Sequence, residues 1–209
     1  MDIDEYTSPH WRNSALLTID FQRDYLEAVP GTSDVLPDLA RVVRAYRAHE
    51  RPIVHVVRLY PPGSTDVDLA RRELVQAGGY LVEPGMPGSQ LPAELFDHPV
   101  ELDAELLLSG QFQAVGKNEY LMYKPRWGAF YRTGLEPRLR ERGVDTVVVG
   151  GCNLPNCPRA TLFEASERDF RAVVLSDGTS QVRDDRIADL ALIGVVSRTV
   201  DEVVGGLAG

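Results

Sequence analysis

Two hydrophobic patterns alternate along this chain and predict its secondary structure. Short uncharged runs of branched residues, such as 146–149, are typical of strands that are buried on both faces. Between these runs, apolar residues recur at helical spacing, as Leu39, Val42 and Tyr46 do. Strands are predicted at residues 14–21, 52–58, 119–123, 146–150, 171–176 and 195–197, and helices at 35–49, 67–76, 130–142, 158–169, 184–192 and 200–204.

Repeated strand–helix units imply a parallel sheet that is covered by helices on both faces. We therefore predict an α/β fold with three layers, α/β/α, in a Rossmann-like arrangement. No repeat, linker or low-complexity segment divides the sequence, so a single domain is predicted for residues 1–209, with its core at about 14–200. The glycine-rich end at 205–209 is predicted to fray.

Composition excludes several classes of partner. The 209 residues are 44% hydrophobic and 25% charged, which is ordinary for a globular protein. The formal net charge of −9 and the lack of a lysine- or arginine-rich run argue against a nucleic-acid partner. No apolar stretch is long enough to span a bilayer, and the acidic start lacks the features of a signal peptide. We therefore expect a cytoplasmic protein without membrane or nucleic-acid partners.

Cys157 is the most informative candidate for chemistry. The strand at 146–150 ends in glycine, and Pro158, directly after the cysteine, suits the first turn of a helix. A thiol at a helix start faces the positive end of the helix, which favours the nucleophilic thiolate. Cys152 lies five residues earlier, outside a CxxC pattern, and is interpreted as a small buried residue. A regulatory disulfide between the two cysteines is the alternative.

Three reactive groups fall at or near predicted strand ends, namely Asp20, Lys124 and Cys157. In parallel sheets, ligands bind outside the carboxyl ends of the strands. Each group alone has an ordinary explanation, as a helix cap, a surface lysine or a buried thiol. Together they supply what acyl transfer needs: a carboxylate that takes the thiol proton, an ammonium that holds the carboxylate, and a thiolate that attacks. None of the four histidines lies beside the cysteine in the sequence.

Three segments, 20–25, 124–133 and 151–161, resemble the signature blocks of the isochorismatase-like cysteine hydrolases. The resemblance covers roughly residues 14–200 and is weakest at 60–115. It implies an isochorismatase-type fold with a six-stranded, mostly parallel sheet and an Asp–Lys–Cys triad. It also implies a homo-oligomer, either a dimer or a tetramer.

Carried over residue by residue, the resemblance makes Asp20 the general base, Lys124 its partner and Cys157 the nucleophile. It also implies a cis peptide bond between Cys152 and Asn153. That bond would direct the N–H of Asn153, together with the N–H of Cys157, at the substrate oxygen as an oxyanion hole.

Tyr25, Trp127 and Gln22 are the candidate substrate-binding residues. Nicotinamidases of this superfamily carry a metal site, built from an aspartate and histidines, soon after the second strand. Residues 58–66 occupy that place here and contain no histidine, and Asp66 with Asp68 would make a poor transition-metal site. The sequence therefore predicts no metal and no cofactor, and it argues against nicotinamide as the substrate.

The leading hypothesis is a cofactor-independent amidohydrolase that cleaves an amide or related C–N bond of a small molecule, other than a peptide bond, through a Cys157 acyl-enzyme. One alternative is an isochorismatase-type hydrolase of an enol ether, which would use Asp20 as an acid and would not need the cysteine. The other alternative is a non-catalytic binding domain, which predicts an unreactive cysteine of ordinary pKa.

Overall fold

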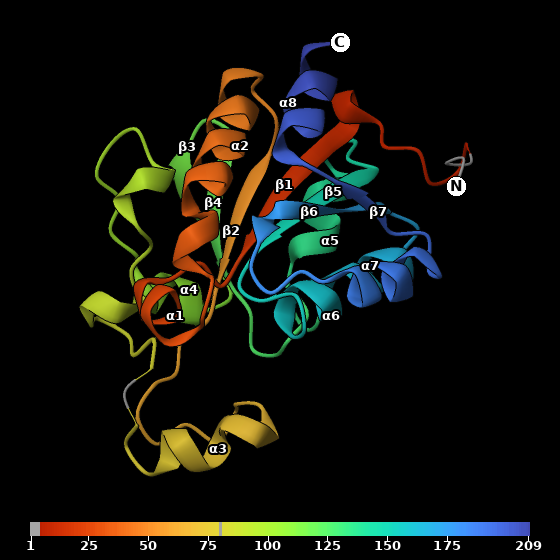
Figure 1. The fold of residues 1–209 in the computed structure, drawn as a ribbon. Coiled ribbons are helices and arrows are strands. Elements are labelled where there is room, and N and C mark those ends of the chain that lie inside the picture. Colours follow the sequence, from red (N-terminus) through yellow and green to blue (C-terminus); the bar gives the residue numbers. More distant parts are fainter. Residues whose placement is uncertain (1–4, 80) are drawn as a thin grey trace.

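The computed structural model describes residues 5–79 and 81–209, and within these ranges a seven-stranded sheet forms the centre of the molecule (Figure 1). The strands are β1 (Ser14–Ile19), β2 (Ile53–Val57), β3 (Gln113–Gly116), β4 (Glu119–Tyr123), β5 (Thr146–Gly151), β6 (Arg171–Thr179) and β7 (Val196–Arg198). They lie in the order β3-β4-β2-β1-β5-β6-β7. Neighbouring strands run parallel, except that β3 pairs antiparallel with β4 at one edge.

The predicted α/β class and mostly parallel sheet are confirmed, with seven strands in place of six. The additional strand, β3, has only four residues, which alternate between half-buried and exposed. Such a strand lies at the sheet edge and carries no long apolar run, so hydrophobic pattern alone did not reveal it.

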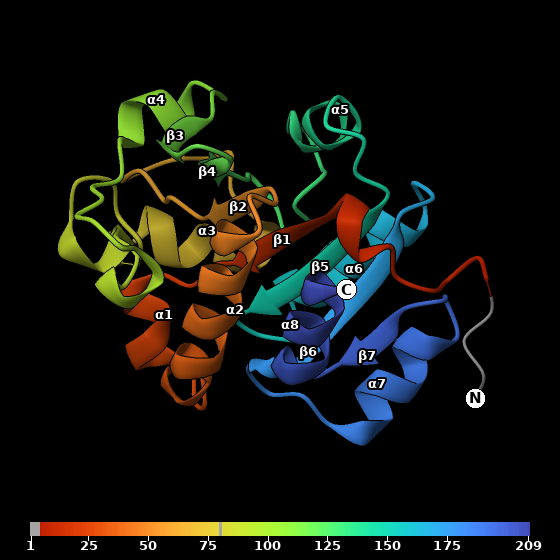
Figure 2. The ribbon, with the colours of Figure 1, turned by 90° about the horizontal axis from the view of Figure 1, so that it is seen from above.

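Helices cover both faces of the sheet, which confirms the three-layer arrangement (Figures 1 and 2). They are α1 (Arg23–Ala28), α2 (Leu36–Ala48), α3 (Leu69–Gln76), α4 (Ala104–Leu108), α5 (Leu135–Arg140), α6 (Cys157–Ser166), α7 (Asp184–Ala191) and α8 (Val200–Ala208). Helices α2 and α8 pack on one face, and α5, α6 and α7 lie on the other. Of these helices within the described ranges, none is long and apolar enough to cross a membrane.

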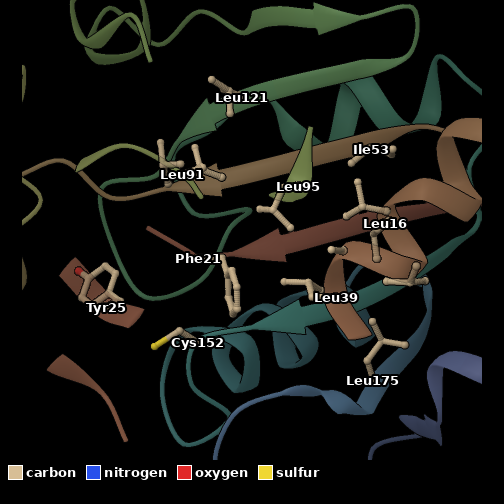
Figure 3. Close-up of a cluster of buried hydrophobic side chains, with 14 of the residues drawn as sticks. Leu16, Phe21, Tyr25, Leu39, Ile53, Leu91, Leu95, Leu121, Cys152 and Leu175 are labelled. Atoms are coloured by element: carbon tan, nitrogen blue, oxygen red, sulfur yellow. The ribbon is translucent and has the colours of Figure 1, made fainter. Parts of the chain in front are cut away.

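The core consists of two apolar clusters, one on each face of the sheet. In β1, Leu16 belongs to the cluster beneath α2, whereas Leu17 belongs to the cluster on the other face. Figure 3 shows part of the first cluster, in which Leu39 of α2 lies near side chains of the sheet such as Leu16 and Leu175. Because successive strand residues point to opposite faces, a strand that is covered on both sides is largely apolar along its whole length.

Helix α5 begins at Leu135, five residues later than the pattern predicts. The backbone N–H of Ala129 donates to the Thr161 hydroxyl at 3.2 Å, and that of Phe130 donates to the Glu164 carboxylate at 2.8 Å. Side chains of α6 therefore hold the preceding segment in an irregular path, which no local pattern could reveal.

The prediction of a frayed C-terminal end was wrong, because α8 continues to Ala208. Leu207 is buried, and Gly206 packs so closely on the Trp11 indole that an added Cβ would lie 2.4 Å from its Nε1. The end of the chain is thus held by tertiary contacts in spite of its glycines.

Candidate active site

The predicted reactive groups meet at the carboxyl ends of the parallel strands. Strand β1 lies between β2 and β5. The strands that follow β1 are first added on the β2 side and later, from β5 on, on the other side, so the strand order switches at β1. Ligands bind at the carboxyl ends of strands beside such a switch point. Asp20 directly follows β1, Lys124 directly follows β4, and Cys157 begins α6 after the loop from β5. The topology therefore brings together three residues that are far apart in the sequence.

Asp20 and Lys124 form a buried ion pair. The Lys124 ammonium donates to Asp20 Oδ2 at 2.8 Å and to the Arg126 carbonyl at 3.2 Å. Asp20 Oδ1 is buried and accepts no hydrogen bond from any of the residues that the structure describes. One carboxylate oxygen is therefore held by the lysine, and the other is left free to accept a proton.

The Cys157 thiol is almost completely buried. Burial, followed by the negative charge of Asp20, raises its pKa to about 12, although Lys124 and Arg58 act in the opposite direction. Burial and the neighbouring carboxylate therefore act against the helix start, which by itself favours the thiolate. At neutral pH the side chain is a thiol, and a base must remove its proton before it can attack.

The loop between β5 and α6 approaches β1 very closely. An added Cβ on Gly151, whose φ is +122°, would lie 2.2 Å from the Ile19 carbonyl oxygen, so only glycine fits there. The next N–H, that of Cys152, donates to the same oxygen at 2.8 Å. The peptide bond between Cys152 and Asn153 is cis. Within the described residues, the N–H groups of Asn153 and Cys157 donate no backbone–backbone hydrogen bond.

A cavity of about 90 Å³ adjoins the reactive groups. Asp20, Asn153 and Cys157 line it, and so do the predicted pocket residues Tyr25 and Trp127. Since one water takes about 30 Å³ in the liquid, the cavity has room for a compact small molecule.

Gln22 does not line this cavity, unlike the other two predicted substrate-binding residues. Its amide nitrogen donates to the carbonyls of Arg58 and Ser89, each at 2.8 Å, and its amide oxygen accepts from the Arg58 N–H at 2.8 Å. The backbone occupies both ends of the amide, so Gln22 anchors the segment that follows β2.

The family model of the isochorismatase domain matches residues 14–201 of this chain. The chain belongs to the isochorismatase family. It is 32% identical to a probable inactive nicotinamidase of Arabidopsis thaliana, over 92% of this chain and 95% of that protein. It is 28% identical to the ureidoacrylate amidohydrolase of Methylobacterium radiotolerans, over 86% of this chain and 72% of that enzyme. The crystal structure of an isochorismatase family protein from Desulfovibrio vulgaris has a TM-score of 0.77 and 29% identity, over 95% of this chain and all of that one.

Among the residues that line the cavity of this isochorismatase-family chain, sequence reasoning missed Arg58, Tyr60 and Arg71. The Arg58 guanidinium is buried, forms an ion pair with Asp68 and donates to the Tyr60 hydroxyl at 2.9 Å. Arg58 could have been selected from the sequence, because it directly follows a buried strand, as Asp20 does. Its partner, Asp68, comes from the segment after β2, and no sequence pattern pairs the two side chains.

The remaining candidate groups are satisfied by protein partners. Cys152 accepts a hydrogen bond from Thr32 at 3.5 Å, burial raises its pKa to about 11, and both cysteines are free thiols. Asp66 pairs with Arg126 and Arg132. The described part of the chain contains no group of three or more histidine, cysteine, aspartate or glutamate side chains suited to a metal.

Proposed function

We propose that this chain is a cysteine hydrolase that cleaves an amide or related C–N bond of a small molecule through an acyl-enzyme on Cys157. The observation that carries the proposal is the Asp20 carboxylate, which lies with Cys157 at one cavity. One of its oxygens is held by Lys124, and the other has no hydrogen-bond partner among the described residues. A thiol whose pKa lies far above neutrality needs such a base.

In the first half of the proposed reaction, Asp20 takes the proton from the Cys157 sulfur, and the sulfur attacks the substrate carbonyl carbon. The carbonyl π electrons move to oxygen, where the N–H groups of Asn153 and Cys157 stabilise the negative charge. When the carbonyl re-forms, the C–N bond breaks. Asp20 returns its proton to the nitrogen, which leaves as ammonia or an amine.

In the second half, Asp20 takes a proton from water, and the hydroxide oxygen attacks the thioester carbon. The C–S bond then breaks, the sulfur recovers a proton from Asp20, and the carboxylic acid leaves. Lys124 acts as a positioning residue, because its buried ammonium holds Asp20 Oδ2 at 2.8 Å between these proton transfers. The balance is amide plus water to acid plus ammonia or amine.

Sequence similarity supports amide hydrolysis as the reaction class, because one relative is a ureidoacrylate amidohydrolase. The Arabidopsis relative is described as a probable inactive nicotinamidase, so family membership does not replace a measurement of turnover. The homo-oligomer, as a dimer or tetramer, and the cytoplasmic location stay predictions, and size-exclusion chromatography with light scattering tests the former.

The test is ammonia release from a panel of small primary amides and ureido compounds, combined with intact-mass analysis. Turnover is expected to disappear in Cys157→Ala, while the native protein shows an acyl adduct on that residue. Cys152→Ala, which removes the neighbouring thiol, is the matched control and keeps the adduct. Turnover that survives in Cys157→Ala refutes the cysteine mechanism and favours acid chemistry by Asp20. A protein with no turnover and no alkylation of Cys157 favours the non-catalytic binding domain.

A further inference from the structure

The charges around the cavity do not balance. Lys124 is paired with Asp20, and Arg58 is paired with Asp68. Arg71, which also lines the cavity, forms no ion pair with any residue in the described ranges. The walls therefore carry one uncompensated positive charge, although the whole chain has a formal net charge of −9.

The Trp127 ring contacts both arginines of the cavity. The guanidinium carbons of Arg58 and Arg71 lie 5.5 and 6.0 Å from the centre of the Trp127 ring, within the range of a cation–π contact. Arg58 also lies 5.2 Å from the centre of the Tyr60 ring. Its buried Nε has no hydrogen-bond partner among the residues that the structure describes. Arg58 thus keeps one guanidinium donor, Nε, without a partner among the described residues.

Arg71 comes from a different part of the fold than the reactive groups. It lies on α3, which Figure 1 shows set apart from the sheet and from the helices that cover it. Asp20, Lys124 and Cys157 follow strands of the sheet itself. Recognition by α3 is therefore separate from the groups proposed for bond cleavage.

We propose that Arg71, assisted by Arg58, binds a carboxylate at the end of the substrate away from the scissile bond. The substrate would then be a short amide that carries a carboxylate a few atoms from its C–N bond. A guanidinium matches a carboxylate with two parallel hydrogen bonds, and a monoanion balances the single excess charge. The cavity of about 90 Å³ limits the length of such a molecule. This inference rests on the proposed amide hydrolysis.

The test compares half-amides with their neutral diamides, which have nearly the same shape. The probes are malonamate, succinamate, maleamate and fumaramate, each beside its diamide, and initial ammonia release gives kcat and KM. The native protein is expected to prefer at least one half-amide by roughly tenfold to a hundredfold in kcat/KM, the range for a hydrogen bond to a charged group.

Variants locate the contact. Arg71→Gln is expected to abolish the preference by raising KM for the half-amide, with little change for the diamide, and Arg71→Lys restores part of it. Arg72→Gln is the matched control, because it removes the same charge from α3 at a residue that does not line the cavity. The inference is overturned if the native protein has the same kcat/KM for the diamides as for the half-amides. An equal loss for both substrates in Arg71→Gln overturns it as well.

A binding experiment separates this inference from the proposed reaction. Cys157→Ala is titrated with the same probes by calorimetry, so no turnover is needed. Binding of a half-amide that is lost in the additional Arg71→Gln variant supports carboxylate recognition even if the native protein releases no ammonia. Absence of any preference for the anion refutes it, whatever the outcome of the turnover assay.

Discussion

The reactivity of Cys157 against pH provides the sharpest test of the site. Burial and the Asp20 charge raise the pKa of this thiol to about 12, whereas a free cysteine has a pKa of about 8.5. Replacement by Asp20→Asn removes the negative charge while keeping the size of the side chain. Because that charge disfavours the thiolate, the pKa of Cys157 is expected to fall in the variant, even though the variant lacks the base for turnover.

The two pKa values determine the size of the effect. At about pH 8, roughly one Cys157 side chain in 10⁴ is a thiolate, against about a quarter of free cysteines. A more basic thiolate is also more nucleophilic, with a Brønsted slope of about 0.4–0.5, which offsets part of the difference. Alkylation at this pH is therefore expected to be about 40- to 100-fold slower than for a free thiol with equal access.

The assay is alkylation by iodoacetamide, followed at the Cys157 peptide by mass spectrometry from about pH 6 to about pH 10. Limited access slows the reaction at every pH, so the shape of the profile carries the information. The native rate is expected to rise across the range without a plateau, and Cys152→Ala verifies that the signal belongs to Cys157. A native inflection at or below pH ~8.5, or an Asp20→Asn profile that does not move to lower pH, refutes the reasoning.

Two further predictions concern stability, measured by urea unfolding. Gly151→Ala is expected to lower the free energy of unfolding by about 3 kcal/mol or more, because its Cβ would lie 2.2 Å from a backbone oxygen. The control Gly31→Ala, also at positive φ but with open space around it, should lower it by only about 1–2 kcal/mol. Equal losses in the two variants contradict the close approach at Gly151. Glu119→Gln is expected to cost about 1.5–3 kcal/mol at neutral pH, because it weakens a partly buried ion pair with Arg47. Burial opposes ionisation of Glu119, but hydrogen bonds from His55 and Arg47 hold its pKa below the usual value. The folded carboxylate therefore stabilises above pH ~4.3, and the gap between native protein and variant should shrink as pH falls below that value; a constant gap refutes the assignment.

Much of the architecture could be predicted because it depends on local composition. Strands such as β1 and β5 are buried on both faces, so their apolar runs are visible without knowledge of their neighbours. The edge strand β3 and the late start of α5 could not be found in this way. The first has no apolar run, and the second depends on side chains of α6 that lie some thirty residues away.

The candidate site divides along the same line. Asp20, Lys124 and Cys157 could be selected because each polar side chain follows or lies near a buried strand. Gln22 stood in a motif beside Asp20, yet its amide holds the backbone around Arg58 and does not reach the cavity. Only coordinates show whether a polar side chain in a motif has hydrogen bonds to spare.

The sequence alone determined the fold class, the order of the main strands and helices, and the three candidate reactive residues at or near strand ends, because these depend on residue type and spacing along the chain. The tertiary structure decided the burial that raises the pKa of Cys157, the pairing of Arg58 with Asp68, and the place of Arg71 in the cavity without an ion-pair partner among the described residues. These properties depend on burial and on distances between residues that are remote in sequence, and electrostatic energies vary steeply with both.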